Sequence, residues 1–324
     1  MTRKIVLVGC GNVGSRHLQA LLKLPYQTRI DIVEPEEKSR ELAKKRLHEI
    51  RFNKIIHHLN WFESIENIEH SSDLAILATT SFKRIELIEK LLKFDHSRFL
   101  IEKIVCQSKT EYNRLLELFN KYKAKGWVNT PRRYFNSYQE IKNRFQNSKR
   151  IHLSVLAGDI GLGTNAIHYI DLFSWLCNDY KIKLNGDFLY DRILKNKRGK
   201  NFVEFAGTII GSSSNGSTLS VHFLPYDNLS ITVDVISERN NLLINETNQK
   251  LYVVEGNKSN KKIKFREEYV SNITNQIAHQ IFRKDNCILP TIHDSWYAHL
   301  ELFRIFDNHI KKLTGKKPRL CPIT

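Results

Sequence analysis

The stretch that decides the fold is Lys4–Glu34, which reads KIVLVGCGNVGSRHLQALLKLPYQTRIDIVE. Ile5–Val8 is a short apolar run rich in β-branched residues, typical of a buried parallel strand. It leads into the glycine motif Gly9–Gly14 and then into Ser15–Leu22, whose apolar residues have helical spacing. A second strand follows and ends on the acidic Glu34. Strand, glycine motif, helix, strand and acid in this order form the dinucleotide-binding fingerprint.

The residues of the fingerprint have separate physical tasks. The first glycine permits a tight turn, the second lets the backbone approach a pyrophosphate, and the third lets the helix lie close to the sheet. The helix N-terminus offers N–H groups and a positive dipole end to the phosphates. Glu34 is expected to bond the adenosine ribose hydroxyls and to repel a 2′-phosphate, which favours NAD over NADP. In the loop itself, the predicted cofactor-binding residues are Gly9, Gly11, Asn12, Val13 and Gly14.

Size and composition restrict the class of protein. A chain of 324 residues forms one very large domain or two ordinary ones. No apolar run approaches the ~20 residues that span a bilayer, and the first residues do not resemble a signal peptide. The five cysteines are scattered without paired spacing, so we expect reduced thiols, no metal site and a cytoplasmic location.

The net charge of +17 comes from 51 basic against 34 acidic residues and has three possible explanations. The first is a lysine-rich solvated surface, and the second is an anionic substrate such as a phosphorylated, nucleotide-linked or acidic sugar. The third is nucleic acid, but the basic residues are spread along the chain without a nucleic-acid-binding motif. We therefore expect neither nucleic acid nor a membrane as partner.

After Glu34 the pattern continues to alternate between helix and strand. Such alternation with buried-type strands predicts a doubly wound parallel sheet over residues 1–130. The expected helices are 36–50, 82–92 and 108–122, and the expected strands are 54–56, 73–78, 98–101 and 127–129.

Near Pro131 the pattern changes to a second kind of domain. Strand-like segments with frequent turn signals run from 182 to 265 and predict an open, mainly antiparallel sheet. The other expected elements are helices at 134–145, 165–177, 271–283 and 291–313 and a strand at 150–156. The predicted class is therefore α/β, with a Rossmann dinucleotide-binding domain (1–130) and an α+β substrate or oligomerisation domain (131–290). The last helix and tail (291–324) are expected to pack back on the first domain.

Two places in the chain could carry chemistry. Glu102-Lys103 lies at the carboxyl end of a strand, where ligands bind in open α/β sheets, although an exposed lysine ending a strand is the simpler explanation. His168 shares a helix face with Asn165 and Asp171, and a histidine oriented by a carboxylate is suited to proton transfer during alcohol oxidation. A packed or solvated histidine is the alternative. The glycine-containing loop 158–163 before this helix favours a nearby ligand, since glycine lets backbone approach one closely.

The order of these motifs resembles the Gfo/Idh/MocA family, the relatives of glucose–fructose oxidoreductase and inositol dehydrogenase. The motifs are GCGNVG, Ala78–Thr80, Glu102-Lys103, Gly163 with His168–Asp171, and Leu289–Thr291, so the similarity covers essentially the whole chain. The resemblance implies a Rossmann domain followed by an α/β domain whose open sheet often forms oligomer contacts. It also implies NAD(P)-dependent oxidation or reduction of sugars and cyclitols, with the lysine and the histidine at the catalytic centre.

The chain departs from the family pattern at several positions. Ile104 replaces a proline, and Thr164 stands where the family commonly has an aspartate four residues before the histidine, with Asn165 and Asp171 as candidates to compensate. Arg84 stands where many relatives have a histidine near the nicotinamide ribose. Arg132 and Arg133 occupy a stretch that often faces substrate, and with Lys103 they could bind an anion; solvent-facing charges are the alternative.

The resulting expectation is an NAD-dependent oxidoreductase that forms a homo-oligomer and acts on an acidic or nucleotide-linked sugar, as in surface-glycan synthesis. A non-catalytic dinucleotide-binding structural or sensor protein remains as the alternative.

Tyr138 and Lys142 match the Tyr-x-x-x-Lys pair of short-chain dehydrogenases, but they lie beyond the first domain and are assigned to a surface helix. The expected catalytic residues are Lys103, His168 and Asp171; the further cofactor-binding residues are Glu34, Ala78, Thr79, Thr80, Arg84 and Glu102; the substrate-binding residues are Arg132, Arg133, Thr164 and Asn165.

Overall fold

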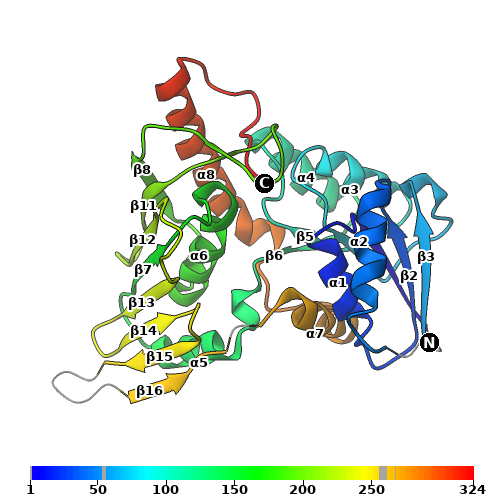
Figure 1. The fold of residues 1–324 in the computed structure, drawn as a ribbon, viewed down its shortest axis with the longest axis horizontal. Coiled ribbons are helices and arrows are strands. Elements are labelled where there is room, and N and C mark those ends of the chain that lie inside the picture. Colours follow the sequence, from blue (N-terminus) through cyan, green and yellow to red (C-terminus); the bar gives the residue numbers. More distant parts are fainter. Residues whose placement is uncertain (1, 53–55, 255–260, 267) are drawn as a thin grey trace. The chain divides into compact units, whose positions relative to one another are not determined.

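The computed structural model describes residues 2–52, 56–254, 261–266 and 268–324, and the chain divides into two compact units (Figure 1). Unit 1 comprises Met1–Cys106, Thr110–Pro131 and Glu268–Ile292. Unit 2 comprises Gln107–Lys109, Arg132–Glu267 and His293–Thr324. No helix in the described ranges combines the length and the apolar character needed to cross a bilayer.

Unit 1 is built on a six-stranded parallel sheet with the strand order β3-β2-β1-β4-β5-β6. The order reverses between β1 and β4, which makes their carboxyl ends the topological switch point where ligands bind in such sheets. The predicted Rossmann sheet is confirmed, although the third strand begins later than expected, and Lys54 and Ile55 lie outside the described residues. The strands are β1 (Arg3–Val8), β2 (Thr28–Val33), β3 (His57–Phe62), β4 (Leu74–Leu77), β5 (Arg98–Glu102) and β6 (Lys125–Asn129).

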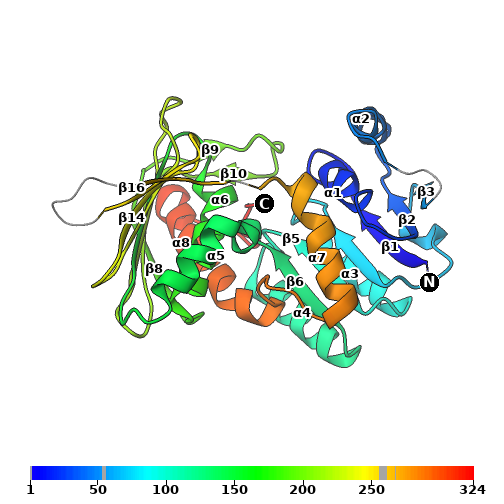
Figure 2. The same ribbon diagram turned by 90° about the horizontal axis from the view of Figure 1, so that it is seen from below.

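The helices of unit 1 include one that returns from the far end of the chain. Helix α7 (Val270–Lys284) lies beside α1 (Gly14–Leu21), and the two views agree on this (Figures 1 and 2). Its apolar face is buried through Ile273, Ile277 and Ile281. The other helices are α2 (Glu37–Leu47), η1 (Ile65–Asn67), α3 (Arg84–Lys93) and α4 (Lys109–Lys121).

Unit 2 contains an eight-stranded sheet with the order β16-β15-β14-β13-β7-β12-β11-β8. Every neighbouring pair is antiparallel except β7 and β12, which are parallel. The mainly antiparallel sheet predicted from the turn signals is thus confirmed. Its strands are β7 (His152–Ala157), β8 (Lys183–Leu189), β11 (Gly207–Ser212), β12 (Thr218–Phe223), β13 (Thr232–Ile236), β14 (Asn241–Asn245), β15 (Lys250–Val253) and β16 (Lys261–Lys264).

Helices cover one face of this sheet. Helices α5 (Asn136–Phe145), α6 (Leu162–Cys177) and α8 (Ile292–Thr314) lie on the same side of it (Figure 2). In β7 the residues Leu153, Val155 and Ala157 are buried, whereas the alternate residues are partly or fully exposed. The remaining elements are η2 (Pro131–Tyr134) and a separate pair of short strands, β9 (Leu194–Lys195) and β10 (Val203–Glu204).

The two units differ from the predicted division in two respects. Helix α7 was assigned to the second domain, but it belongs to unit 1, where Lys23 at the end of α1 donates to the carbonyl oxygen of Ser271 at 2.7 Å. The last helix and tail were expected on the first domain, but His293–Thr324 belongs to unit 2. There the amide of Val203 donates to the carbonyl oxygen of Pro322 at 2.8 Å. Both errors concern the docking of amphipathic helices, which sequence periodicity does not specify.

Candidate active site

The glycine loop has the geometry that the fingerprint requires. Gly9 has φ +84°, and a Cβ added to it would lie 2.9 Å from the amide nitrogen of Thr79. A Cβ on Gly14 would lie 2.0 Å from the carbonyl oxygen of Gly9, so α1 packs directly on the loop. A Cβ on Gly11, in contrast, would meet only Ser39 Oγ, at 3.7 Å. The first and third glycines are therefore needed by the fold, and the second leaves open backbone of the kind a pyrophosphate approaches.

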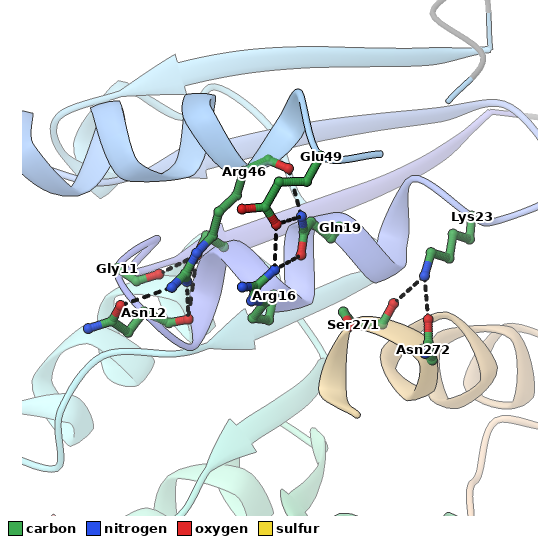
Figure 3. A network of polar contacts seen from close by, with 10 residues as sticks. Gly11, Asn12, Arg16, Gln19, Lys23, Arg46, Glu49, Ser271 and Asn272 are labelled. Atoms are coloured by element: carbon green, nitrogen blue, oxygen red, sulfur yellow. Dashed lines mark hydrogen bonds and ion pairs between the residues drawn. The ribbon is translucent and has the colours of Figure 1, made fainter. Parts of the chain in front are cut away.

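Side chains from α1 and from the end of α2 brace this loop (Figure 3). Ser15 Oγ donates to the carbonyl oxygen of Gly11 at 2.7 Å, and Arg46 donates to the carbonyl oxygen of Asn12 at 2.6 Å. One turn further, Arg16 pairs with Glu49 at 2.8 Å. The sequence analysis did not identify Arg46, because nothing local in the chain links it to a loop more than thirty residues earlier.

Glu34 lies at the loop, where the fingerprint places it. Its side chain is buried, Oε2 accepts the amide of Cys10 at 2.6 Å, and Oε1 accepts the amide of Glu36 at 3.1 Å. Burial, together with the charge of Glu34, raises the pKa of the Cys10 thiol to about 12, so this thiol stays protonated. The open backbone at Gly11 and the oriented carboxylate of Glu34 together fit a dinucleotide.

Arg84 was predicted to contact the cofactor, and the structure gives it a different task. Its side chain is buried, and its guanidinium donates to the carbonyl oxygens of Thr79, Glu102 and Ile104. A guanidinium has five N–H donors in a fixed fork, and in Arg84 several of them donate to backbone oxygens. Arg84 thus ties the segment after β4 to the end of β5 and the residues that follow it, and these bonds disfavour its predicted contact with the nicotinamide ribose.

Glu102 and Lys103 are both buried at the end of β5. Lys103 is 5% exposed, which excludes the simpler explanation of an exposed lysine ending a strand. Glu102 Oε1 lies 2.9 Å from His17 Nε2 and accepts a hydrogen bond from Asn129. Burial alone would raise the pKa of Glu102, but these hydrogen bonds and the charges of His17 and Lys103 hold it at about 2. An ionised carboxylate is therefore fixed beside Lys103.

Helix α6 presents a small polar patch at its first turns. Between Leu162 and Ser174 every residue is buried except Thr164, Asn165 and His168. These three residues lie within one turn of one another, so they share an accessible face of the helix. The structure thus brings together three of the residues predicted for catalysis and substrate binding.

Asp171 was predicted to orient His168, but its carboxylate is engaged by an arginine. Arg133 Nη2 lies 2.6 Å from Oδ1 and Arg133 Nε lies 2.9 Å from Oδ2, so the pair is bidentate. Arg133 Nη1 donates to Tyr180 Oη at 3.1 Å. Both members of the pair are buried, and despite the cost of burial the Asp171 charge raises the pKa of Arg133. This arrangement disfavours both Asp171 as the partner of His168 and Arg133 as a substrate ligand.

Arg132 is likewise held inside unit 2. It forms two hydrogen bonds to Glu246, at 3.0 and 2.8 Å, and one to Tyr169 Oη at 2.6 Å. Tyr138 Oη donates to Glu246 at 2.6 Å, so Tyr138 is a buried member of this cluster and not a surface residue. Lys142, assigned with it to a surface helix, donates to the last carbonyl groups of α6. The guanidinium charge of Arg132 is therefore neutralised by Glu246, which disfavours its predicted role in holding an anion.

A residue that the sequence analysis missed lies at the start of α6. Glu204 Oε2 accepts the hydroxyl of Thr164 at 2.6 Å, and Oε1 accepts the amide of Gly163. Glu204 comes from β10, a strand of two residues. No periodic signal marks so short a strand, and Glu204 lies forty residues after Thr164, which it contacts.

Comparison with known proteins shows what the first part of the chain is similar to. Residues 3–130 match the model of the Gfo/Idh/MocA family, described as an oxidoreductase family with an NAD-binding Rossmann fold. Over these residues the match confirms the resemblance inferred from the motifs. A search of curated protein sequences found no match to the chain.

Solved structures share the fold of the whole chain. The UDP-N-acetylglucosamine 3-dehydrogenase GnnA of Acidithiobacillus ferrooxidans is 12% identical, with a TM-score of 0.72 over 94% of this chain and 97% of that one. The WlbA dehydrogenase of Bordetella pertussis, in complex with NADH and UDP-GlcNAcA, is 14% identical, with a TM-score of 0.68 over 100% and 99%. A super-repressor mutant of Gal80p from Saccharomyces cerevisiae is 14% identical, with a TM-score of 0.71 over 96% and 97%. At such identities the likeness establishes the fold alone.

Proposed function

We propose that the protein is an NAD-dependent oxidoreductase that acts on a sugar or a sugar derivative. The observation that carries the proposal is the open backbone at Gly11 between two glycines that the fold itself requires, with Glu34 oriented beside it. Bound nicotinamide supplies or accepts a hydride at a carbinol carbon of the substrate. The buried carboxylate of Glu34 opposes a 2′-phosphate, so we propose NAD rather than NADP.

We assign the proton chemistry to Lys103 and His168. His168 lies on the accessible face of α6 and takes the proton of the substrate hydroxyl, or returns it. Lys103, beside the ionised Glu102, donates a hydrogen bond to the reacting oxygen and stabilises its developing negative charge. Thr164 and Asn165, on the same face as His168, contact the substrate.

The substrate that we favour is an acidic or nucleotide-linked sugar. The net charge of +17 supports an anionic ligand. Of the proteins with this fold, GnnA is a UDP-N-acetylglucosamine 3-dehydrogenase and WlbA is a dehydrogenase in complex with UDP-GlcNAcA. We also propose that the protein is a homo-oligomer assembled through the sheet of unit 2. The face of that sheet without helices exposes Ile210, Ile236 and Leu243, each at least 36% accessible.

Turnover tests the proposal. NADH binding is followed by fluorescence, and oxidation or reduction is screened across neutral, acidic and nucleotide-linked sugars. Lys103→Ala and His168→Ala should each abolish turnover while NADH affinity is retained. Normal turnover in both variants rejects the catalytic assignment. Tight NADH binding without turnover on any sugar favours the alternative, a non-catalytic dinucleotide-binding protein.

A further inference from the structure

The carboxylate of Glu204 occupies the first turn of α6, although Glu204 belongs to β10. Besides the Thr164 hydroxyl and the Gly163 amide, it accepts the amide of Thr164 at 3.2 Å and the amide of Phe205 at 3.1 Å. The side-chain amide of Asn196 lies 3.4 Å from Oε2. Within the described part of the chain Glu204 forms no ion pair, so neutral donors alone hold this carboxylate.

The loop before α6 is shaped around Glu204. A Cβ added to Gly161, where φ is +75°, would lie 2.2 Å from the carboxyl carbon of Glu204. A Cβ added to Gly163 would lie 2.7 Å from Oε1. These two glycines were first interpreted as giving a ligand access to backbone. In the structure they give that access to Glu204 itself.

The position of Glu204 decides what the start of α6 can bind. The N-terminus of a helix attracts anions because its first N–H groups point outward and its dipole end is positive. Here the amides of Gly163 and Thr164 already donate to a carboxylate. A substrate carboxylate or phosphate at this place would meet like charge and would find these donors occupied.

The same contacts set the direction of hydrogen bonds on the accessible face of α6. Thr164 has one hydroxyl proton, and it is donated to Glu204, so towards any other group this hydroxyl acts only as an acceptor, as it does towards the side-chain amide of Asn196 at 3.3 Å. Asn165 donates its amide hydrogens to the carbonyl oxygens of Ile160 and Gly161. The side-chain carbonyl oxygen of Asn165 is then the group that can accept a hydrogen bond from a ligand. Both residues present acceptors, which complement the hydroxyl groups of a sugar.

We propose that Glu204 is a specificity-determining residue, which makes the first turn of α6 a hydroxyl-binding subsite and excludes anions from it. The inference rests on the proposed function and refines it. A neutral, hydroxyl-bearing part of the substrate lies against Thr164 and Asn165, and any anionic group of the substrate lies elsewhere. Burial raises the pKa of Glu204, as expected for a carboxylate held without a cation.

The first experiment needs no turnover. Glu204→Ala leaves the amides of Gly163, Thr164 and Phe205 around a space that once held a carboxylate. Formate should enter this space and raise the Tm of Glu204→Ala in a saturable manner, recovering most of the loss, whereas chloride at equal ionic strength should not. Glu140→Ala, which removes an exposed glutamate of α5, is the matched control. Equal effects of formate on both variants, or none on Glu204→Ala, would overturn the proposal.

The second experiment uses the sugar found by the turnover screen. Glu204→Gln keeps the shape of the side chain, but its amide group can donate to the Thr164 hydroxyl. The hydroxyl proton of Thr164 is then available to donate towards the substrate. We expect KM to rise about tenfold or more with kcat little changed, because substrate binding is affected and hydride transfer is not. Thr164→Val should reproduce the rise in KM. Thr164→Ser keeps the hydroxyl and should have a KM near that of the wild type. Glu140→Gln should have no effect.

Unchanged KM in Glu204→Gln would overturn the proposal even if the alanine variant failed to fold. Absence of turnover in the wild type would instead count against the proposed function, and the formate experiment would still decide whether the start of α6 is a carboxylate cradle.

Discussion

His17 Nε2 on α1 lies 2.9 Å from Glu102 Oε1 at the end of β5, and both side chains are buried. Because Glu102 is ionised and can only accept, Nε2 carries the proton of this hydrogen bond. The opposite ring nitrogen, Nδ1, lies 2.8 Å from Thr274 Oγ1 on α7. The imidazole therefore joins α1 to the end of β5, next to Lys103, and also to α7.

This contact predicts a dependence of stability on pH. The pKa of Glu102 falls from 4.5 to about 2 on folding, so its charged form stabilises the native state. The contribution, about 3 kcal/mol, is complete above the unfolded pKa and is lost as the pH falls from about 5 to 2. Because His17 lowers this pKa more than Asn129 or Lys103 does, His17→Ala should lower the free energy of unfolding at pH 7 and weaken its dependence on acid pH.

Urea unfolding at several pH values measures both effects. His58→Ala, which removes an exposed histidine from the edge strand β3, is the control and should leave the dependence of stability on acid pH unchanged. If the free energy of unfolding of His17→Ala falls between about pH 5 and pH 2 as steeply as that of the wild type, the charge of Glu102 does not depend on His17.

The glycine loop predicts that two similar substitutions act differently. Gly11→Ala places a methyl group in open space, so its Tm should stay near that of the wild type, but the methyl group blocks the pyrophosphate and should weaken NADH binding by about tenfold or more. Gly14→Ala drives a methyl group into the Gly9 carbonyl and should destabilise unit 1. Thermal unfolding and fluorescence titration distinguish the two effects. Wild-type NADH affinity in Gly11→Ala would mean that the cofactor does not lie over this loop.

Glu34 predicts the preference between the two nicotinamide dinucleotides. Glu34→Gln keeps the size of the side chain but removes the charge that opposes a 2′-phosphate. We expect NADH affinity to fall about tenfold, since a hydrogen bond to a charged group contributes about 1.5 kcal/mol or more, and NADPH affinity to rise. Glu37→Gln, an exposed glutamate at the start of α2, is the matched control. The idea fails if the ratio of NADH to NADPH affinity is the same in Glu34→Gln and the wild type.

Local signals in the chain predicted much of this architecture. The fingerprint from Ile5 to Glu34, the alternation of strand and helix up to Asn129, and the turn-rich second half each depend on residues close in sequence, and all are confirmed by the sheets. The motif order that identified the family is also a local property. Such features follow from periodicity and turn chemistry, which a single sequence records.

The tasks of the charged residues could not be predicted in the same way. Arg132 pairs with Glu246, which lies 114 residues further along the chain, and Glu204 contacts Thr164 from forty residues away. An arginine has the same sequence pattern whether it binds a substrate anion or an internal partner. Only the fold decides which carboxylate or carbonyl oxygens reach it, and so the internal partners of Arg84, Arg132 and Arg133 and the contact of Glu204 were not predicted.

The buried pair of Arg132 and Glu246 predicts a loss of stability without a loss of cofactor binding. Glu246→Ala leaves a guanidinium buried without its counter-charge. We expect this to lower the free energy of unfolding by about 3–5 kcal/mol. Glu246→Gln keeps the hydrogen bonds to Tyr138 and Tyr169 in part and should cost less. Urea unfolding measures the loss, and NADH titration of the folded variant should give the wild-type Kd. A stability of Glu246→Ala equal to that of the wild type would show that Arg132 finds another anion and would restore it as a candidate substrate ligand.

The face of the unit 2 sheet that lacks helices predicts how the protein assembles. Strand alternation places Leu156, Ile210, Ile236 and Leu243 outward, next to polar residues such as Ser154 and Ser220. Burying such apolar side chains in a second copy of the sheet would contribute roughly 25 cal/mol for each Å² removed from water. A lysine introduced there would have to be buried without a partner.

The double variant Ile210→Lys with Ile236→Lys should therefore reduce the oligomer to monomers at micromolar concentration, as measured by sedimentation equilibrium. Its far-UV spectrum should be unchanged, because both side chains are already 40% accessible and contribute little to the core. Phe82→Lys, which exchanges an exposed apolar residue of unit 1 that is 47% accessible, should leave the assembly intact. If the double variant sediments as the same oligomer as the wild type, the sheet face is not the interface, since two buried lysines on it could not be accommodated.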